Sequence, residues 1–116
     1  MVGLVVVSHS YTLACGVVEL AREMGGPDLR IEHAGGMDTP DHAMGTDPTL
    51  ILDAIQRASG DDGVVVLMDL GSAVLSAEMA LELLPPEVAD RVTLCPAPIV
   101  EGAVAAAVAA RLGQSA

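Results

Sequence analysis

The sequence is nearly without aromatic residues, since it has no phenylalanine or tryptophan and only one tyrosine, Tyr11. Sites that need aromatic walls, such as base-stacking platforms or flavin pockets, therefore lack their building material. The sequence also contains no lysine, and 5 basic residues, all arginines, stand against 16 acidic ones, which gives a formal charge of −11. A chain with this charge is a poor partner for nucleic acids and for anionic membranes.

Long hydrophobic runs are missing as well. The apolar stretch Val2–Val7 has no basic flank and is too short for a signal peptide or a membrane span, so we expect a cytoplasmic protein. The two cysteines, Cys15 and Cys95, have neither the spacing of metal ligands nor the density of a disulfide framework. We interpret both as reduced, small, buried hydrophobic residues.

The composition that remains is that of a folded domain. Hydrophobic residues make up 52% of the 116 positions and charged residues 18%, which provides enough apolar material for a packed core and excludes a disordered chain. The length is that of one domain, which we assign to residues 1–116.

Strands and helices are expected to alternate four times along the chain. The strands are predicted at Val2–Val7, Leu29–Ala34, Val64–Met68 and Arg91–Cys95, and the helices at 13–24, 48–59, 73–84 and 100–112. The first helix has one apolar stripe, formed by Leu13, Val17, Leu20 and Met24. Because the strands are too hydrophobic for a sheet with one wet face, we predict a doubly wound α/β domain, with four mainly parallel strands in the order 2-1-3-4 and helices on both faces.

In such a sheet the ligand site lies beyond the carboxyl ends of the strands, where the strand order reverses. The segments that leave the two strands at this point are Ser8-His9-Ser10 and Asp69-Leu70-Gly71-Ser72, so a histidine and a carboxylate should face each other. A neutral imidazole can accept a phosphoryl group on one ring nitrogen when a neighbour holds the proton on the other. Asp69 could hold that proton for His9, and no metal or other cofactor is needed. The alternatives are a histidine that only ends a strand and an aspartate that accepts turn amides.

A phosphoryl group on His9 would need counter-dipoles, and the two helix N-termini that follow these strands can supply them. We therefore assign phosphate binding to Ser10, Gly71 and Ser72. For Ser8, Ser10, Ser72 and Thr46 the competing interpretation is helix capping, and the same holds for Pro98 and Glu101 at the last helix. His33 and His42, near Asp38 and Asp41, match no ligand spacing, so we favour a solvated loop over a metal site.

Four segments, taken together and in order, resemble a known family. They are Val-Ser-His-Ser at 7–10, Gly35-Gly36 followed by Gly45-Thr46, Asp-Leu-Gly-Ser-Ala at 69–73, and Ala-Pro-Ile-Val-Glu-Gly-Ala at 97–103. The family is the phosphotransferase subunit of phosphoenolpyruvate-dependent dihydroxyacetone kinase, whose core is a mannose-type IIA domain of the phosphotransferase system (PTS). The resemblance extends from Val2 to about Gly113.

The resemblance implies a phosphoryl carrier. It implies that His9 receives phosphate from the phosphocarrier protein HPr and passes it to ADP on the nucleotide-binding subunit of the kinase, while Asp69 orients His9. It also implies a homodimer, in the short form that lacks fused HPr-like and enzyme-I-like domains. The loop from Met37 to Gly45 departs from the resemblance, and no role follows for it.

Other functions fit the sequence less well or differ in the acceptor. A IIA domain of a mannose-type sugar transport system would use the same histidine and pass the phosphate to a IIB domain. A receiver domain would need an acidic cluster after the first strand and a lysine, neither of which this sequence has. A flavodoxin-like carrier would have only Tyr11 to stack on the flavin. A regulatory module that has lost phosphoryl transfer is also open at this point.

Overall fold

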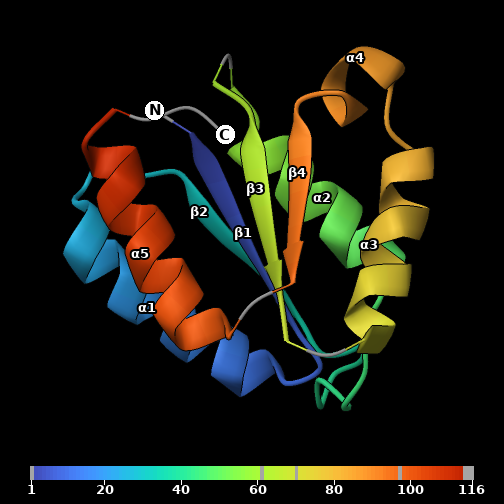
Figure 1. The fold of residues 1–116 in the computed structure, drawn as a ribbon. Coiled ribbons are helices and arrows are strands. Elements are labelled where there is room, and N and C mark those ends of the chain that lie inside the picture. Colours follow the sequence, from blue (N-terminus) through green and yellow to red (C-terminus); the bar gives the residue numbers. More distant parts are fainter. Residues whose placement is uncertain (1, 61, 70, 97, 114–116) are drawn as a thin grey trace.

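A parallel four-stranded sheet with helices on both faces forms the domain (Figure 1). The computed structural model describes residues 2–60, 62–69, 71–96 and 98–113. The strands are β1 (Gly3–Ser8), β2 (Ile31–Gly35), β3 (Val64–Met68) and β4 (Val92–Pro96), and the helices are α1 (Tyr11–Gly25), α2 (Pro48–Ala58), α3 (Gly71–Glu82), α4 (Pro86–Ala89) and α5 (Ile99–Arg111). The strand order is β2-β1-β3-β4, and all neighbouring pairs are parallel, which confirms the predicted fold class.

The two central strands hold the core together. Every residue of β1 is buried, and four of the five residues of β3 are buried, as β-branched strands covered on both sides should be. One hydrophobic cluster joins α1 and α5 to the sheet, and a second joins α2 and α3 to its other face. Figure 1 shows these two helix layers on opposite sides of the strands.

The apolar stripe predicted for the first helix is not its buried face, so this prediction is wrong. Leu13, Leu20 and Met24 are 43–45% exposed, and of the stripe only Val17 is buried. The core side of α1 is instead lined by small residues, because α1 packs closely against the alanine-rich α5. The buried residues of α1 are Ala14, Val17, Val18, Ala21 and Gly25.

Three further details differ from the expectations. The short helix α4 was not predicted, and it forms because Pro86 stands at its first position, where a missing N–H costs nothing. The edge strand β4 is half-buried to exposed rather than covered on both faces. Cys15 and Cys95 are both half-buried, not fully buried, although both are free thiols.

The register places the ends of three strands side by side. Ser8 of β1 pairs with Gly35 of β2, and Val7 pairs with Met68 of β3. The residues that follow, from His9 and Asp69 onward, therefore leave the sheet at the same edge. The helices α1 and α3 begin at that edge, at the lower end of the sheet in Figure 1. Within the described ranges, no helix has the length and apolar character needed to cross a membrane.

Candidate functional site

His9 is the first residue after β1, and its backbone is fixed on both sides. Its N–H donates to Asp69 Oδ2 at 3.1 Å, and its carbonyl oxygen accepts from the N–H of Gly45 at 3.0 Å. Gly45 has a φ of 140°, a region that favours glycine, so the chain can turn toward His9 at this position. The histidine backbone is thus held between the end of β3 and the segment that leads into α2.

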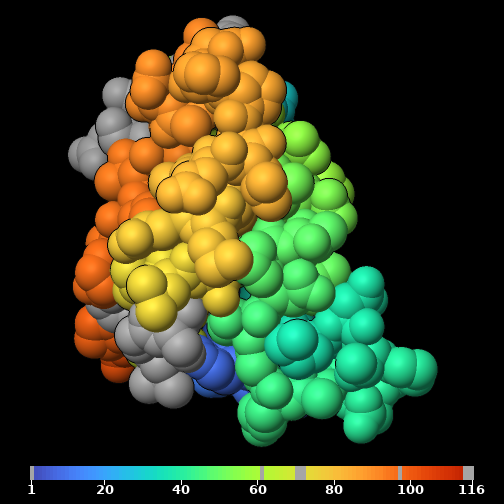
Figure 2. All heavy atoms as spheres, turned by 90° about the vertical axis from the view of Figure 1, so that its right-hand side faces the viewer, coloured from blue at the N-terminus to red at the C-terminus, as the bar shows by residue number. Residues whose placement is uncertain are grey.

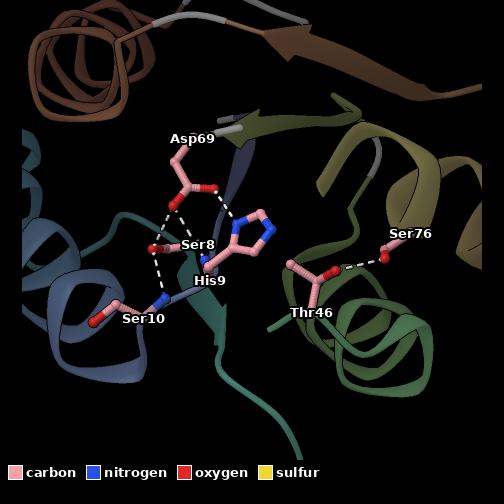
Figure 3. A network of polar contacts seen from close by, with 6 residues as sticks. All are labelled: Ser8, His9, Ser10, Thr46, Asp69 and Ser76. Carbon is pink, nitrogen blue, oxygen red and sulfur yellow. Dashed lines mark hydrogen bonds and ion pairs between the residues drawn. The ribbon is translucent and has the colours of Figure 1, made fainter. Parts of the chain in front are cut away.

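The imidazole of His9 faces the carboxylate of Asp69 (Figure 3). The distance from His9 Nδ1 to Asp69 Oδ1 is 3.0 Å, and the two side chains are 22% and 15% exposed. An ionised carboxylate can only accept a hydrogen bond, so this contact places the proton on Nδ1. Nε2 is then the ring nitrogen that carries the lone pair, and the side chain is partly exposed.

Ser8 forms a hydrogen bond with the carboxylate of Asp69. Its hydroxyl donates to Asp69 Oδ2 at 2.8 Å and accepts from the N–H of Ser10 at 3.0 Å, and the residue has no exposed surface. Three donors therefore converge on Asp69: the Ser8 hydroxyl, the His9 ring and the His9 amide. Burial is the largest single influence on Asp69 and opposes its ionisation, yet these hydrogen bonds outweigh it and hold the pKa of Asp69 below its ordinary value.

The hydroxyl of Ser10 caps a helix, whereas the hydroxyl of Thr46 contacts another side chain. Ser10 is the N-cap of α1, since its hydroxyl accepts from the N–H of Leu13 at 3.2 Å. Thr46 does not cap α2, because Asp47 does so by accepting from the N–H of Thr49 at 2.9 Å. The Thr46 hydroxyl instead lies 2.6 Å from the hydroxyl of Ser76 in α3.

Gly71 and Ser72 occupy the first turn of α3, at the same edge of the sheet as His9. Leu70, the residue between them and Asp69, lies outside the described residues. The first amides of α3 and of α1 have no partner within their own helix, so both helix ends can stabilise an anion at this edge. Phosphate binding by Ser10, Gly71 and Ser72 stays a prediction, as do the roles of His9 and Asp69.

The other two histidines are part of a separate cluster. The ring of His42 stacks on Tyr11 with centroids 3.7 Å apart, and His33 meets Tyr11 edge to face at 5.5 Å. Cys15 Sγ lies 3.7 Å from His33 Nε2. Burial is the main reason that the pKa of His33 lies below its ordinary value. In the described part of the chain, no group of three or more His, Cys, Asp or Glu side chains is placed to hold a metal ion.

A hollow of about 160 Å³ opens beside this cluster, and its lining includes Tyr11, His33 and His42 but not His9. The segment 36–47 forms part of its wall and projects from the body beside α2, where Figure 2 shows it in teal. At the last helix, Pro98 stands at the N-cap of α5 without a side-chain capping bond, and Glu101 is exposed in the first turn.

Sequence reasoning weighed Ser8 only as a phosphate donor or a cap, not as a partner of Asp69, and it left Ser76 out of the predicted site. The signal for Ser8 was its place at the end of an otherwise aliphatic buried strand, where a hydroxyl needs a partner. Ser76 gave no such signal, because a serine inside a helix is common and its contact with Thr46 spans thirty positions.

The chain is similar to known proteins along nearly its whole length. The family model EIIA-man, described as the PTS system fructose IIA component, matches residues 3–116. A protein from Pantoea ananatis named "PEP-dependent dihydroxyacetone kinase, phosphoryl donor subunit DhaM" is 54% identical over 97% of this chain, which spans 24% of that protein. A protein from Listeria innocua named "PEP-dependent dihydroxyacetone kinase 2, phosphoryl donor subunit DhaM" is 42% identical to this chain. The match covers 93% of this chain and 85% of that protein.

A solved structure agrees with these relatives. The crystal structure of EF1359, titled a protein of unknown function, superposes with a TM-score of 0.84 at 36% identity, over 99% of this chain and 87% of the other. These matches confirm the resemblance that the four sequence segments indicated. The chain belongs to the EIIA-man family of PTS components.

Proposed function

We propose that this chain is a phosphoryl carrier of a PEP-dependent dihydroxyacetone kinase and that it works through a phosphohistidine at His9. The observation that carries the proposal is the hydrogen bond between His9 Nδ1 and Asp69. It leaves Nε2 as the nucleophile and fixes the plane of the ring. This chain covers 24% of the Pantoea ananatis relative and 85% of the Listeria innocua relative, and the names of both support the kinase system.

The proposed chemistry needs no group beyond the side chains. The lone pair of His9 Nε2 forms a bond to phosphorus while the bond between phosphorus and the donor nitrogen breaks, and the donor keeps that electron pair. Nδ1 keeps its proton throughout. The ring gains positive charge as the new bond forms, and the Asp69 carboxylate at 3.0 Å balances it. The reverse sequence at Nε2 passes the phosphoryl group to the acceptor.

As donor we propose HPr, and as acceptor ADP held on the nucleotide-binding subunit of the kinase. The formal charge of −11 and the lack of lysine support a nucleotide presented by a partner, since a free one would be repelled. HPr is a cytoplasmic donor, so we place the carrier in the cytoplasm. We also propose a homodimer. The relatives favour this system over the mannose-type sugar transport alternative.

The test is intact mass after incubation with phosphoenolpyruvate, enzyme I and HPr. We compare the wild type with His9→Ala and with His42→Asn, a control that removes an exposed imidazole but tolerates the left-handed backbone at position 42, where φ is 50°. We expect one acid-labile phosphoryl group on the wild type and on the control, and none on His9→Ala. Uptake by His9→Ala would overturn the site.

A second step tests the acceptor. The phosphorylated protein is purified and mixed with the nucleotide-binding subunit and ADP, and ATP is measured. Loss of phosphate from the carrier with formation of ATP supports the kinase system. Transfer to a IIB domain without ATP formation would instead support the sugar transport alternative.

A further inference from the structure

A hydroxyl pair beside the His9–Asp69 pair is unexplained by local structure. Thr46 Oγ1 and Ser76 Oγ are 2.6 Å apart, and they join the segment before α2 to the middle of α3. Neither hydroxyl caps a helix, because the N-cap of α2 is Asp47 and Ser76 lies inside α3. Both residues are half-buried.

The pair lies on the far side of the imidazole from Asp69. The amide of Gly45, the residue before Thr46, donates to the carbonyl oxygen of His9 at 3.0 Å, which ties this backbone to the histidine. Figure 3 shows the ring of His9 between Asp69 and Thr46, with its second nitrogen turned away from the carboxylate. Thr46 therefore stands on the side where a group bound to Nε2 would extend.

The distribution of positive charge explains why hydroxyls are needed there. Arginine is the only strongly basic residue of the chain, and none of the five has its backbone at the His9 edge of the sheet. In a parallel α/β sheet, the starts of strands and the ends of helices lie at the opposite edge. Three arginines are in the last turn of a helix and two directly precede a strand: Arg22, Arg57, Arg111, Arg30 and Arg91. A phosphoryl group at His9 thus depends on neutral donors.

We propose that Thr46, held by Ser76, is a positioning residue that donates a hydrogen bond to the phosphoryl group on His9 Nε2. Either hydroxyl can be the donor in the contact between them. When Ser76 donates to Thr46, the Thr46 proton is directed away from Ser76 and can reach a phosphoryl oxygen. This inference rests on the proposed phosphohistidine and adds a donor from a third segment of the chain to the two helix N-termini.

The test compares Thr46→Val, which keeps the shape of the side chain and removes the hydroxyl, with Thr46→Ser, Ser76→Ala and the control Thr49→Val. Thr49 is exposed, and it donates the capping bond of α2 to Asp47 from its backbone N–H, which the substitution keeps. Each protein is equilibrated with phosphorylated HPr, and the phosphoryl distribution between the two is measured. Phosphorus NMR of the phosphohistidine and the melting temperature are recorded for each variant.

A hydrogen bond to a charged phosphoryl group predicts that Thr46→Val shifts the equilibrium toward HPr by about tenfold or more. Ser76→Ala should shift it in the same direction by less. Thr46→Ser should restore the wild-type distribution, and Thr49→Val should leave it unchanged. The phosphorus resonance should move in Thr46→Val, a change that a purely structural tie between the segment and α3 would not cause.

The outcomes separate the two proposals. If the wild type takes up no phosphate, the proposed function fails. If the wild type is phosphorylated, but Thr46→Val and Ser76→Ala keep both its equilibrium and its phosphorus resonance, only the positioning role is overturned. If Thr46→Val melts too low to be studied, Ser76→Ala, which leaves Thr46 in place, decides the question by the same two measurements.

Discussion

The hydroxyl of Ser8 can be removed with almost no change in shape, which makes Ser8→Ala a direct probe of the Asp69 network. Ser8 has no exposed surface, and its oxygen bridges Asp69 Oδ2 at 2.8 Å and the N–H of Ser10 at 3.0 Å. The substitution removes the donor to the carboxylate and the acceptor of the amide at once. The ring and the amide of His9 still hold Asp69.

The expected cost follows from these two bonds. A hydrogen bond to a charged group contributes about 1.5–3 kcal/mol, and the half-buried Ser10 amide can regain water, so that loss is smaller. We expect Ser8→Ala to lower the free energy of unfolding at neutral pH by about 2–3 kcal/mol. The part of this cost that acts on the ionised form alone raises the pKa of Asp69 toward its ordinary value.

The pH dependence distinguishes this cause from simple loss of packing. The pKa of Asp69 is lower in the folded protein than its ordinary value of 3.8, so its stabilising effect is complete above that value and is lost as pH falls through the folded pKa. In urea unfolding, the wild type and Ser8→Ala should therefore differ most at neutral pH and less in acid, where Asp69 is protonated. The control Ser10→Ala removes the N-cap of α1 and should lower the free energy of unfolding by about 1 kcal/mol. This loss should be the same at neutral pH and in acid.

If the difference between Ser8→Ala and the wild type stays constant as pH falls from neutral until Asp69 is protonated in the folded wild type, the argument is refuted, because the hydroxyl then does not act on the charge of Asp69. A rise in the pKa of Asp69, followed by NMR of its carboxyl carbon, would support it independently. Phosphoryl uptake by Ser8→Ala should be slower than in the wild type but should not be abolished, since the His9–Asp69 contact remains.

Three other substitutions test separate parts of the structure. Asp69→Asn should slow phosphoryl transfer in a stopped-flow assay with HPr, because the amide can select the wrong imidazole tautomer, and an unchanged rate would reduce Asp69 to a turn residue. Gly3→Ala should lower the unfolding free energy by about 1–3 kcal/mol, since its Cβ would overlap the Ala58 carbonyl oxygen, whereas Gly16→Ala on open helix surface should raise it by about 0.5–1 kcal/mol in the same urea titrations. Burial lowers the pKa of His33, so stability should decline as pH falls below its ordinary value of 6.5, and His33→Gln should flatten that decline.

The strands and the strand order were predictable because their signals are local. A run such as Val2–Val7 is too apolar for any place but a sheet covered on both faces, and alternation with helices then leaves few topologies. The apolar stripe of α1 misled for the opposite reason. Periodicity records where large apolar side chains recur, but α5 packs so closely that the buried face of α1 consists of alanine, valine and glycine. Leu13, Leu20 and Met24 are displaced to the surface, and only the packing partner determines this.

The candidate site shows the same division between local and distant signals. His9 and Asp69 end two adjacent parallel strands, so the strand order alone brings them together. The contact between Thr46 and Ser76 depends on how the segment 36–47 returns toward His9 and on the rotation of α3 about its axis. Neither quantity is encoded in a short pattern. The proposed phosphoryl site lies in a chain of charge −11, so it needs hydrogen-bond donors from several elements. A donor pair such as Thr46 and Ser76 is brought to the end of a strand only by the tertiary structure.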